Sequence, residues 1–323
     1  MKFRTIARTV FGFALLAASS GAALAQYPDR PIRLLTPFPP GGAVDVVTRL
    51  VADKMAAELG KAFVIEAKAG GGGIIATDAV AKADKDGYTL LITTPNHTIN
   101  AALNPKLPYD TEKDLAPVSI FAAVPEVLVS HPSAPFSDFK GFVEYARANP
   151  GKLNYSSAGI GTLPHITMEV LLKAAGIKVT HVPYRGAAPA MTDLLAGVVQ
   201  LKLDTYATSY QNVEAGRLKM LAYAGKARSP LMPNVPTVAE MGVPGYEGIL
   251  WIGIMAPAGT PQPIIDKLAA AAAKAVKAPD LAERFKKDGV DAVGGTPAEF
   301  ARQIAREIPE WRDVIQSAGI KAE

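Results

Sequence analysis

The sequence predicts an α/β protein of two lobes, each a mostly parallel sheet flanked by helices. Short β-rich runs alternate with helical patterns over nearly the whole chain. In the first helical stretch, Val44, Val47, Val51 and Met55 recur at the spacing of one helix face. Such alternation is typical of parallel strands covered by helices on both faces. With 323 residues, the chain is long enough for about two domains.

Residues 1–25 read as a signal peptide. Lys2, Arg4 and Arg8 form a basic start, the apolar run VFGFALLAA follows, and Ala23-Leu24-Ala25 fits a small-residue cleavage site. We therefore expect cleavage after Ala25 and a periplasmic protein. A retained membrane anchor is the alternative, although the apolar run is short for a span. No Cys follows the run, which excludes a lipid-anchored form.

Composition limits the functions that are open to the remaining chain. The leader contains three of the 34 Lys and Arg residues, so 31 remain against 30 Asp and Glu. This near-balance gives no argument for a nucleic acid or an anionic membrane as partner. The absence of Cys excludes disulfides, thiol nucleophiles and Cys-ligated metals.

Nine apolar or β-branched runs are expected to form strands. In chain order they are 32–38, 63–69, 89–95, 118–131, 153–159, 179–185, 201–207, 218–225 and 249–257. The run at 118–131 is long for a single strand, and Pro125 interrupts it. We interpret it as a crossover between lobes, with the return in the loop-rich stretch 230–248.

This interpretation makes one lobe discontinuous. Lobe 1 is predicted to contain residues 26–122 and 248–323, and lobe 2 residues 123–247. The Ala-rich segment 268–278 is expected to be a small-residue or exposed helix. The last helix carries Phe300, Ile304, Ile308, Trp311 and Ile315 on one stripe, which we assign to the core.

Four glycine-containing turns each follow a predicted strand and open a helix. They are TPFPPGGAVD at 36–45, and the segments 69–83, 156–176 and 184–198. In a parallel sheet such turns lie at the carboxyl ends of the strands, where ligands bind. Helix starts also offer unpaired N–H groups and the positive end of the helix dipole. The turns therefore favour an anion site between the lobes, unless their glycines serve turn geometry alone.

Two nucleotide sites can be weighed against these turns. None ends in the Gly-Lys-Ser/Thr of a phosphate-binding loop. Gly71, Gly73 and Ala76 match G-x-G-x-x-A, but the next strand ends in 93–96, TTPN, without the acid that would bind a ribose. We expect no cofactor.

The sequence contains no recognisable catalyst. It lacks the G-x-S-x-G, H-E-x-x-H and S-x-x-K motifs, and its four His residues have no metal-ligand spacing. His165 and Glu169 stand one helical turn apart, which favours a surface or cap contact. We therefore predict neither catalytic residues nor metal ligands, and a binding protein rather than an enzyme.

Several segments together resemble the Bug (TctC-like) family, the periplasmic solute receptors of tripartite tricarboxylate transporters. The resemblance runs in order from about residue 27 to the C-terminus. Its segments include YPDRPIRLLTPFPPGGAVDVVTRLVA, DGYTLLITT, LPYDTEKDLAPVS, LNYSSAGIGTLPHITMEVL, HVPYRGAAPAMTDLLAG and GRLKMLAYAGKARSPLMPNVPTVAEMG. It implies a type II Venus-flytrap fold that closes on a small carboxylate or dicarboxylate. It also implies the membrane subunits of such a transporter as partners; we expect a monomer that binds no nucleic acid.

The resemblance also implies a set of ligand-binding positions in both lobes. In lobe 1 they are Phe38, Pro39, Pro40, Gly41, Gly42, Asp45, Gly72, Gly73, Thr93, Thr94 and Asn96. In lobe 2 they are Ser156, Ser157, Gly159, Gly161, Thr162, His165, Arg185, Gly186, Ala187 and Asp204. The family often reads E-N-R-P-G-A-G-G where this chain has EAKAGGGG at 66–73, so a side-chain role at 67 or 68 is in doubt.

Some roles stay open at this point. Arg185 either anchors a carboxylate or braces lobe 2, and Asp204 either accepts from a ligand donor or caps a helix. An exported α/β enzyme acting on a small organic acid, and a receptor that feeds a sensor kinase, are the alternative functions. The identity of the carboxylate is not encoded in backbone contacts.

Overall fold

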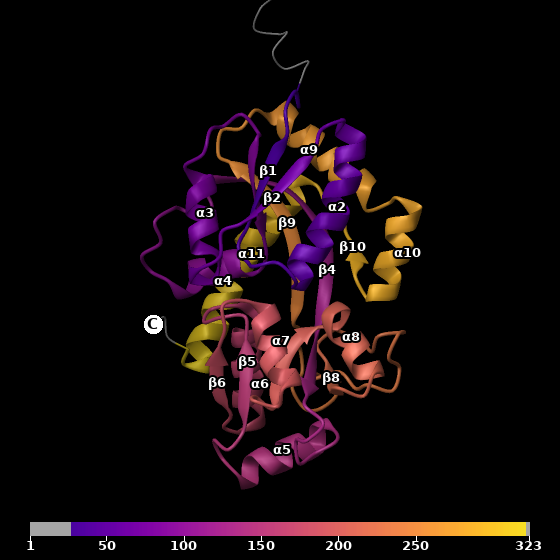
Figure 1. Cartoon of the computed structure of the whole chain (residues 1–323). Helices are drawn as coiled ribbons and strands as arrows, with labels where there is room; N and C mark the ends of the chain where they lie inside the picture. Colours follow the sequence, from indigo (N-terminus) through magenta and orange to yellow (C-terminus); the bar gives the residue numbers. More distant parts are fainter. Residues whose placement is uncertain (1–26, 321–323) are drawn as a thin grey trace, which may run out of the picture.

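The computed structural model describes residues 27–320; the predicted signal peptide lies outside these residues. The chain forms two bodies, one above the other, with strands running from one into the other (Figure 1). We call the upper body lobe 1 and the lower body lobe 2. No helix within 27–320 is both long and apolar enough to cross a membrane.

Lobe 1 is built on a sheet whose order is β2-β1-β3-β9-β4, with β10 paired to β4. Its strands are β1 (Ile32–Thr36), β2 (Phe63–Ala67), β3 (Thr89–Thr93), β9 (Ile249–Pro257), β10 (Asp291–Ala292) and the first part of β4 (Leu115–Ser130). Its helices are α2 (Ala43–Leu59), α3 (Ile74–Ala81), α4 (Asn96–Leu103), α9 (Gln262–Ala275), α10 (Pro279–Asp288) and α11 (Pro297–Ala318).

Lobe 2 repeats the arrangement with the order β4-β7-β5-β6 and β8 on β4. Its strands are β5 (Asn154–Ser157), β6 (Thr180–Pro183), β7 (Leu201–Thr205) and β8 (Lys219–Tyr223). Its helices are α5 (Phe139–Ala148), α6 (Leu163–Ala175), α7 (Ala187–Leu195) and α8 (Tyr206–Glu214). All nine predicted strands are present, while the two-residue β10 was not predicted.

The sheets are parallel only in part. Strands β2, β1 and β3 are parallel to one another, as are β6, β5 and β7. The strands that join the lobes pair antiparallel, because β9 returns from lobe 2 alongside the outgoing β4. The α/β class is therefore confirmed, and each sheet is mixed, with a parallel trio beside antiparallel connecting strands.

Strand β4 belongs to both lobes. Its residues 115–125 pair with β9, and residues 126–130 pair with β7 and β8. Pro125 lies at the point where the partner changes, and it remains within the strand. The pairing register shifts between Pro117 and Ser119 and between Ile120 and Ala122. Such irregularities bend a strand, so β4 is bent within lobe 1, ahead of the junction at Pro125.

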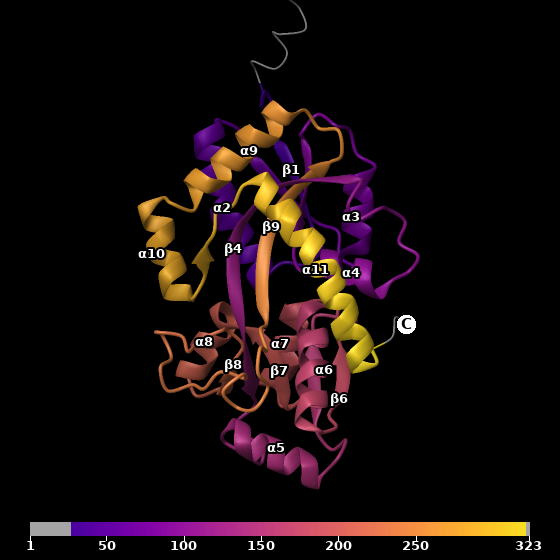
Figure 2. The same cartoon turned by 180° about the vertical axis from the view of Figure 1, so that it is seen from behind.

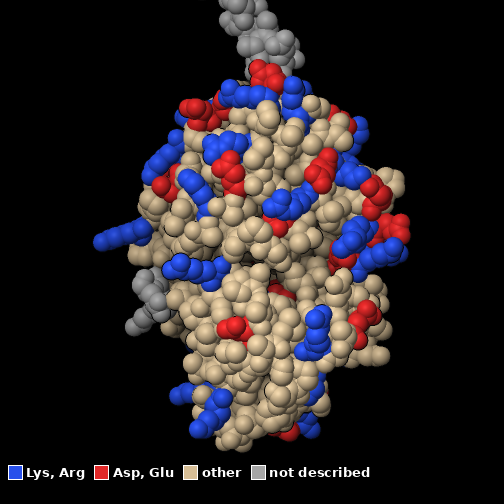
Figure 3. Space-filling view, in the orientation of Figure 1, with Lys and Arg blue, Asp and Glu red and all other residues tan. Residues whose placement is uncertain are grey.

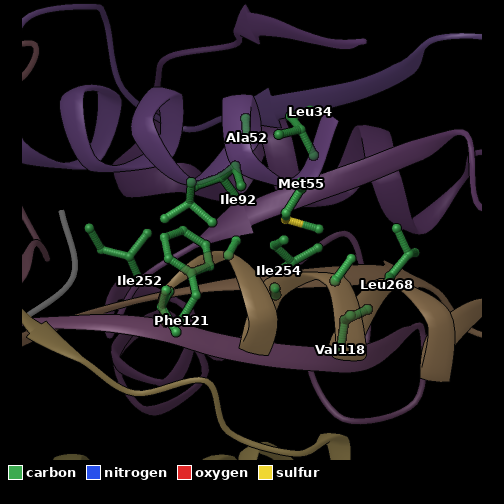
Figure 4. Close-up of a cluster of buried hydrophobic side chains, with 14 of the residues drawn as sticks. Leu34, Ala52, Met55, Ile92, Val118, Phe121, Ile252, Ile254 and Leu268 are labelled. Atoms are coloured by element: carbon green, nitrogen blue, oxygen red, sulfur yellow. The ribbon is translucent and has the colours of Figure 1, made fainter. Parts of the chain in front are cut away.

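Each lobe has its own apolar core. In lobe 1, helices α2 and α9 pack on one face of the sheet, where Met55, Ile92, Phe121 and Ile254 are buried together (Figure 4). The Ala-rich helix α9 is packed rather than exposed, since its small side chains permit a close approach to the sheet. On the other face lies α11 (Figure 2), with Phe300 among the buried side chains.

Candidate ligand-binding cleft

The glycine-rich turns of the two lobes face one another in pairs across the cleft. A Cβ added to Gly186 would lie 2.7 Å from Pro39 Cγ, and one added to Gly42 would lie 3.4 Å from Ala187 Cβ. The turn at 69–73 meets the turn at 156–162, because a Cβ on Gly72 would lie 3.4 Å from the Ile160 carbonyl oxygen. Turns from the two lobes are in contact at both places, so the structure is a closed form of the cleft.

A cavity of about 60 Å³ lies between the closed lobes. Its lining from lobe 1 and the lobe junction is Phe38, Pro39, Gly42, Ala43, Val44, Asp45, Asn96, Glu126 and Leu250. Lobe 2 contributes Ala158, Thr162, Pro164, Ala187, Lys202, Leu203, Asp204 and Thr205. Side chains at the seam are mostly uncharged, with acidic atoms visible near its centre (Figure 3).

Three helices point uncapped starts at this cavity. The residues before α2, α7 and α8 are Gly42, Gly186 and Thr205, and none of them caps its helix with a side-chain hydrogen bond. The first N–H groups of such a helix have no partner within the helix, and the dipole is positive there. Gly42, Ala187 and Thr205 line the cavity. The cavity is therefore suited to an anionic group of a ligand.

Helix α6 also starts at the cavity, but its donors are already used. Asn96 Oδ1 accepts from the Leu163 N–H at 3.0 Å, and the next residue, Pro164, has no N–H. Thr162 occupies the cap position, yet its hydroxyl donates to the Gly159 carbonyl at 2.6 Å and does not cap the helix. Asn96 thus holds α6 from the opposite lobe.

Asp45 is buried in the first turn of α2. Its carboxylate accepts from the Gly41 N–H at 3.2 Å and forms an ion pair with Arg49 at 2.8 Å. Gly41 has a φ of +96°, which a residue with a side chain rarely adopts. The glycine permits the loop to fold back on the helix start, where the carboxylate is held by the loop and by Arg49.

The buried charges of lobe 2 lie on β7. Lys202 and Asp204 point to the same face of the strand and form an ion pair, and both are almost fully buried. Asp204 also accepts from the Thr208 and Ser209 hydroxyls at 2.6 and 2.8 Å. Burial raises the pKa of the neighbouring Glu126 to about 8. These contacts give Asp204 a fixed set of donors.

The predicted site residues fall into three groups. Those that line the cavity are Phe38, Pro39, Gly42, Asp45, Asn96, Thr162, Ala187 and Asp204. Four others, Gly72, Gly159, Arg185 and Gly186, line only an outer groove. Phe38 and Pro39 line both the cavity and this groove. Those that line neither are Pro40, Gly41, Gly73, Thr93, Thr94, Ser156, Ser157, Gly161 and His165.

The outer groove is where all four turns meet. Arg185 is exposed there and lies outside the cavity lining. The groove has a volume of about 670 Å³ and contains backbone from residues 69–72, 158–160 and 183–186. Arg185 is thus placed at the rim of the cleft.

His165 belongs to an aromatic stack beside the cleft. Its ring lies 4.3 Å from that of His181, which lies 4.7 Å from the ring of Tyr155. Burial lowers the pKa of His165 to about 4 and, together with the neighbouring His165, that of His181 to about 3. Glu169 accepts from the Tyr155 hydroxyl at 2.5 Å, so it pairs with Tyr155 rather than with His165.

Two charged residues of the cavity, Glu126 and Lys202, were not predicted. Both stand inside apolar runs, VPEVLV and LKLDT, whose neighbouring side chains are buried. An ionisable residue within a buried strand is uncommon unless it is paired or functional. A charged residue inside an apolar run was thus the sequence signal that could have identified Glu126 and Lys202.

Comparisons with known proteins identify the family. Residues 47–320 match the model of the tripartite tricarboxylate transporter family receptor. BugT of Bordetella pertussis is 35% identical over 297 residues, which cover 91% of each chain. In its fold the chain is similar to Rpa4515 of R. palustris with adipate, with a TM-score of 0.88 and 35% identity over 91% of this chain and 99% of that one.

A second solved structure agrees with this assignment. MatC of Rhodopseudomonas palustris with bound malate has a TM-score of 0.85 and 33% identity, covering 90% of this chain and 100% of the other. The resemblance found in the sequence is thereby confirmed, and with it the two-lobed receptor fold. The chain belongs to the tripartite tricarboxylate transporter receptor family of periplasmic solute-binding proteins.

Proposed function

We propose that the protein captures a small organic carboxylate or dicarboxylate in the cavity between its lobes and delivers it to the membrane subunits of a tripartite tricarboxylate transporter. The relatives with adipate and with malate support this ligand class. The family supports the transporter as destination.

The convergence of three uncapped helix starts carries the proposal. The N-termini of α2, α7 and α8 present N–H donors from both lobes to one enclosed space. A carboxylate bound there receives donors from lobe 1 and lobe 2 at once. Because it can bridge the lobes only when they are together, it stabilises the closed form.

The predicted site residues take different roles under this proposal. Those that line the cavity contact the ligand directly or through water, while Gly72, Gly159, Arg185 and Gly186 form the rim that closes over it. The remaining predicted positions support the turns. Ser156, for example, donates to the Ala190 carbonyl at 3.3 Å, which ties β5 to α7.

We propose lobe boundaries at 122/123 and 247/248, so that closure bends β4 and β9. Hydrogen exchange with and without ligand tests this assignment. Altered protection in β4 near residues 122–126 and at the start of β9 is expected, and unchanged protection there would contradict it.

The proposed location and state of the protein have direct tests. Export with cleavage after Ala25 gives Gln26 as the first residue, which N-terminal sequencing of protein from the periplasmic fraction would detect. A monomer is expected in size-exclusion chromatography with light scattering. A bound ligand that is recovered chemically unchanged after incubation supports a receptor rather than an enzyme.

The decisive experiment is a thermal-shift screen of organic acids, followed by calorimetry on those that raise the melting temperature. A ligand that binds only the native state stabilises it by mass action, by about 2.7 kcal/mol at 100 times its dissociation constant. Neutral sugars serve as controls. If sugars stabilise the protein and no carboxylate does, the proposed function is wrong.

A further inference from the structure

Glu126 is a buried acid that lines the ligand cavity. It is 2% exposed and lies on β4, at the point where this strand leaves β9 and joins β7. Its Oε2 is 2.9 Å from the Thr167 hydroxyl, which is also 2.7 Å from the Leu163 carbonyl oxygen. A hydroxyl has one proton and cannot donate to both. Oε1 has no hydrogen-bond partner within residues 27–320.

The cation nearest in the cavity is already neutralised. Lys202 forms an ion pair with Asp204, and its ammonium lies 3.4 Å from the Leu203 carbonyl oxygen. Asp204 in turn has hydroxyl donors from Thr208 and Ser209. This group is therefore balanced in charge before any ligand enters.

The third acid of the cavity is balanced as well. Asp45 forms its ion pair with Arg49, which reaches it from outside the cavity. Of the three carboxyl groups in the lining, Glu126 is then the one without a cation of its own among the described residues. Burial favours the neutral acid and outweighs the charge of the nearby Lys202, which agrees with the raised pKa of Glu126.

We propose that Glu126 receives a cationic amino group, so that the ligand is a small amino carboxylic acid. Its carboxylate lies at the starts of α2, α7 and α8, and its ammonium lies against Glu126. This inference rests on the proposed function, since it names the group at the other end of the same ligand.

An ammonium supplies what the site lacks. It brings up to three donors, and it brings the positive charge that the ionised carboxylate needs. A second carboxylate would instead meet Glu126, Asp204 and Asp45, none of which offers it a positive charge. The closed cavity of about 60 Å³ also favours a compact ligand.

Binding of an ammonium at Glu126 should release a proton to the buffer. Burial favours Glu126 as a neutral acid at pH 7 without ligand, whereas the ion pair with the ligand requires the carboxylate. The proton passes to the buffer when the ligand binds. A ligand that offers a carboxylate or a hydroxyl at this position leaves that proton in place.

The test compares acids that differ only in the amino group. Alanine is paired with propionate, aspartate with succinate and glutamate with glutarate, and each is titrated by calorimetry at pH 7. We expect at least one amino acid to bind ten-fold or more tightly than its deaminated partner. Titration in PIPES and in Tris, which differ in ionisation enthalpy, should show release of close to one proton.

Two variants locate the effect. Glu126→Gln keeps the shape of the side chain and removes the charge, so it should weaken the amino acid ten-fold or more and abolish proton release. Glu307→Gln is the matched control, because Glu307 is also buried but hydrogen-bonds to Thr98 and Trp251 away from the cavity. Glu307→Gln should leave the affinity for the amino acid and the proton release unchanged. If Glu126→Gln does not fold, proton release by the unaltered protein decides alone.

The outcomes separate this inference from the proposed function. Deaminated acids that bind as tightly as the amino acids, without proton release, would overturn the role of Glu126 and leave the receptor for carboxylates standing. If no member of any pair binds and the wider acid screen is also negative, the proposed function itself fails.

Discussion

Asn96 of lobe 1 caps helix α6 of lobe 2: its Oδ1 accepts a hydrogen bond from the Leu163 N–H at 3.0 Å. Its Nδ2 donates to the Gly72 carbonyl at 3.2 Å, within lobe 1. One buried side chain therefore fixes a turn of its own lobe and a helix of the other. The bond to Gly72 survives opening of the cleft, whereas the bond to Leu163 exists only when the lobes are together.

Replacing Asn96 should weaken ligand binding more than it weakens the fold. In Asn96→Leu the Leu163 N–H is left without a partner in the closed form, whereas water reaches it in the open form. A buried donor without a partner costs about 1–3 kcal/mol, so the affinity should fall by roughly 5- to 150-fold. Calorimetry measures the affinity, and small-angle scattering measures the fraction of closed molecules.

Asn100→Leu is the control for this variant. Asn100 lies on the same helix and also donates to the Gly72 carbonyl, at 3.1 Å, but within residues 27–320 it makes no hydrogen bond to lobe 2. Asn100→Leu should reduce thermal stability but weaken ligand binding less than Asn96→Leu does. Equal losses of affinity in the two variants would mean that the bond across the cleft contributes nothing to closure.

Gly186→Ala should hinder closure by direct contact. The added Cβ would lie 2.7 Å from Pro39 Cγ, a contact that the open cleft does not make. We expect at least a ten-fold loss of affinity, with scattering curves shifted toward the open form. Gly176→Ala imposes a positive φ as well but has open space around it, so it should lower the melting temperature without this loss. An unchanged affinity in Gly186→Ala would show that the turns do not need to meet.

Glu126 should make the protein less stable as the pH rises. The pKa of this acid is about 8 in the folded chain, against an ordinary value of 4.5. Between these values the folded state binds more protons than the unfolded state, so stability falls with rising pH, by at most about 1.4 kcal/mol per unit. The melting temperature of Glu126→Gln, relative to the unaltered protein, should therefore increase from pH 5 to pH 8. A constant difference would contradict the buried neutral acid.

The stacked histidines should make the protein sensitive to acid. The pKa values of His165 and His181 are lowered by burial to about 4 and 3, from 6.5. Their contribution to stability is complete above pH 6.5 and is lost as the pH falls toward 4, because the unfolded chain binds protons first. His165→Phe keeps an aromatic ring in the stack and should flatten this decline in thermal melts.

His97 remains as a background in that experiment. Burial also lowers its pKa, to about 4, and it lies in lobe 1 away from the stack. The contribution of the stack is therefore the difference between the unaltered protein and His165→Phe in how steeply the melting temperature falls with pH. His131→Gln, outside the stack, serves as a second control. If the melting temperature falls with pH as steeply in His165→Phe as in His131→Gln, the stack is not the source of the acid sensitivity.

The strands and helices were predictable because each depends on a local pattern, an apolar run with turn residues at its ends. The strand at 63–69, for example, is bounded by Gly60 and by the glycines at 70–73. Strand β10 was missed because Asp291 and Ala292 are both exposed and have no apolar pattern. It exists through its pairing with β4, which is a property of the tertiary structure.

The site was predictable in outline but not in its pairings. The sequence places each glycine-rich turn at the end of a strand, whereas only the folded chain shows that Pro39 meets Gly186 and that Gly72 meets Ile160. Lys202 and Glu126 were missed for a related reason. Whether a charged residue in an apolar strand faces solvent or an enclosed cavity depends on what the other lobe covers.

The position of β9 sets the order in which the molecule can be completed. This strand lies between β3 and β4, and its partners Leu91 and Met255 are far apart in the chain. The lobe that contains the N-terminal strands therefore stays unfinished until the last quarter of the polypeptide has been synthesised. Contacts of such high contact order form slowly. For the proposed export, this topology has the consequence that the chain is not yet compact during most of its synthesis.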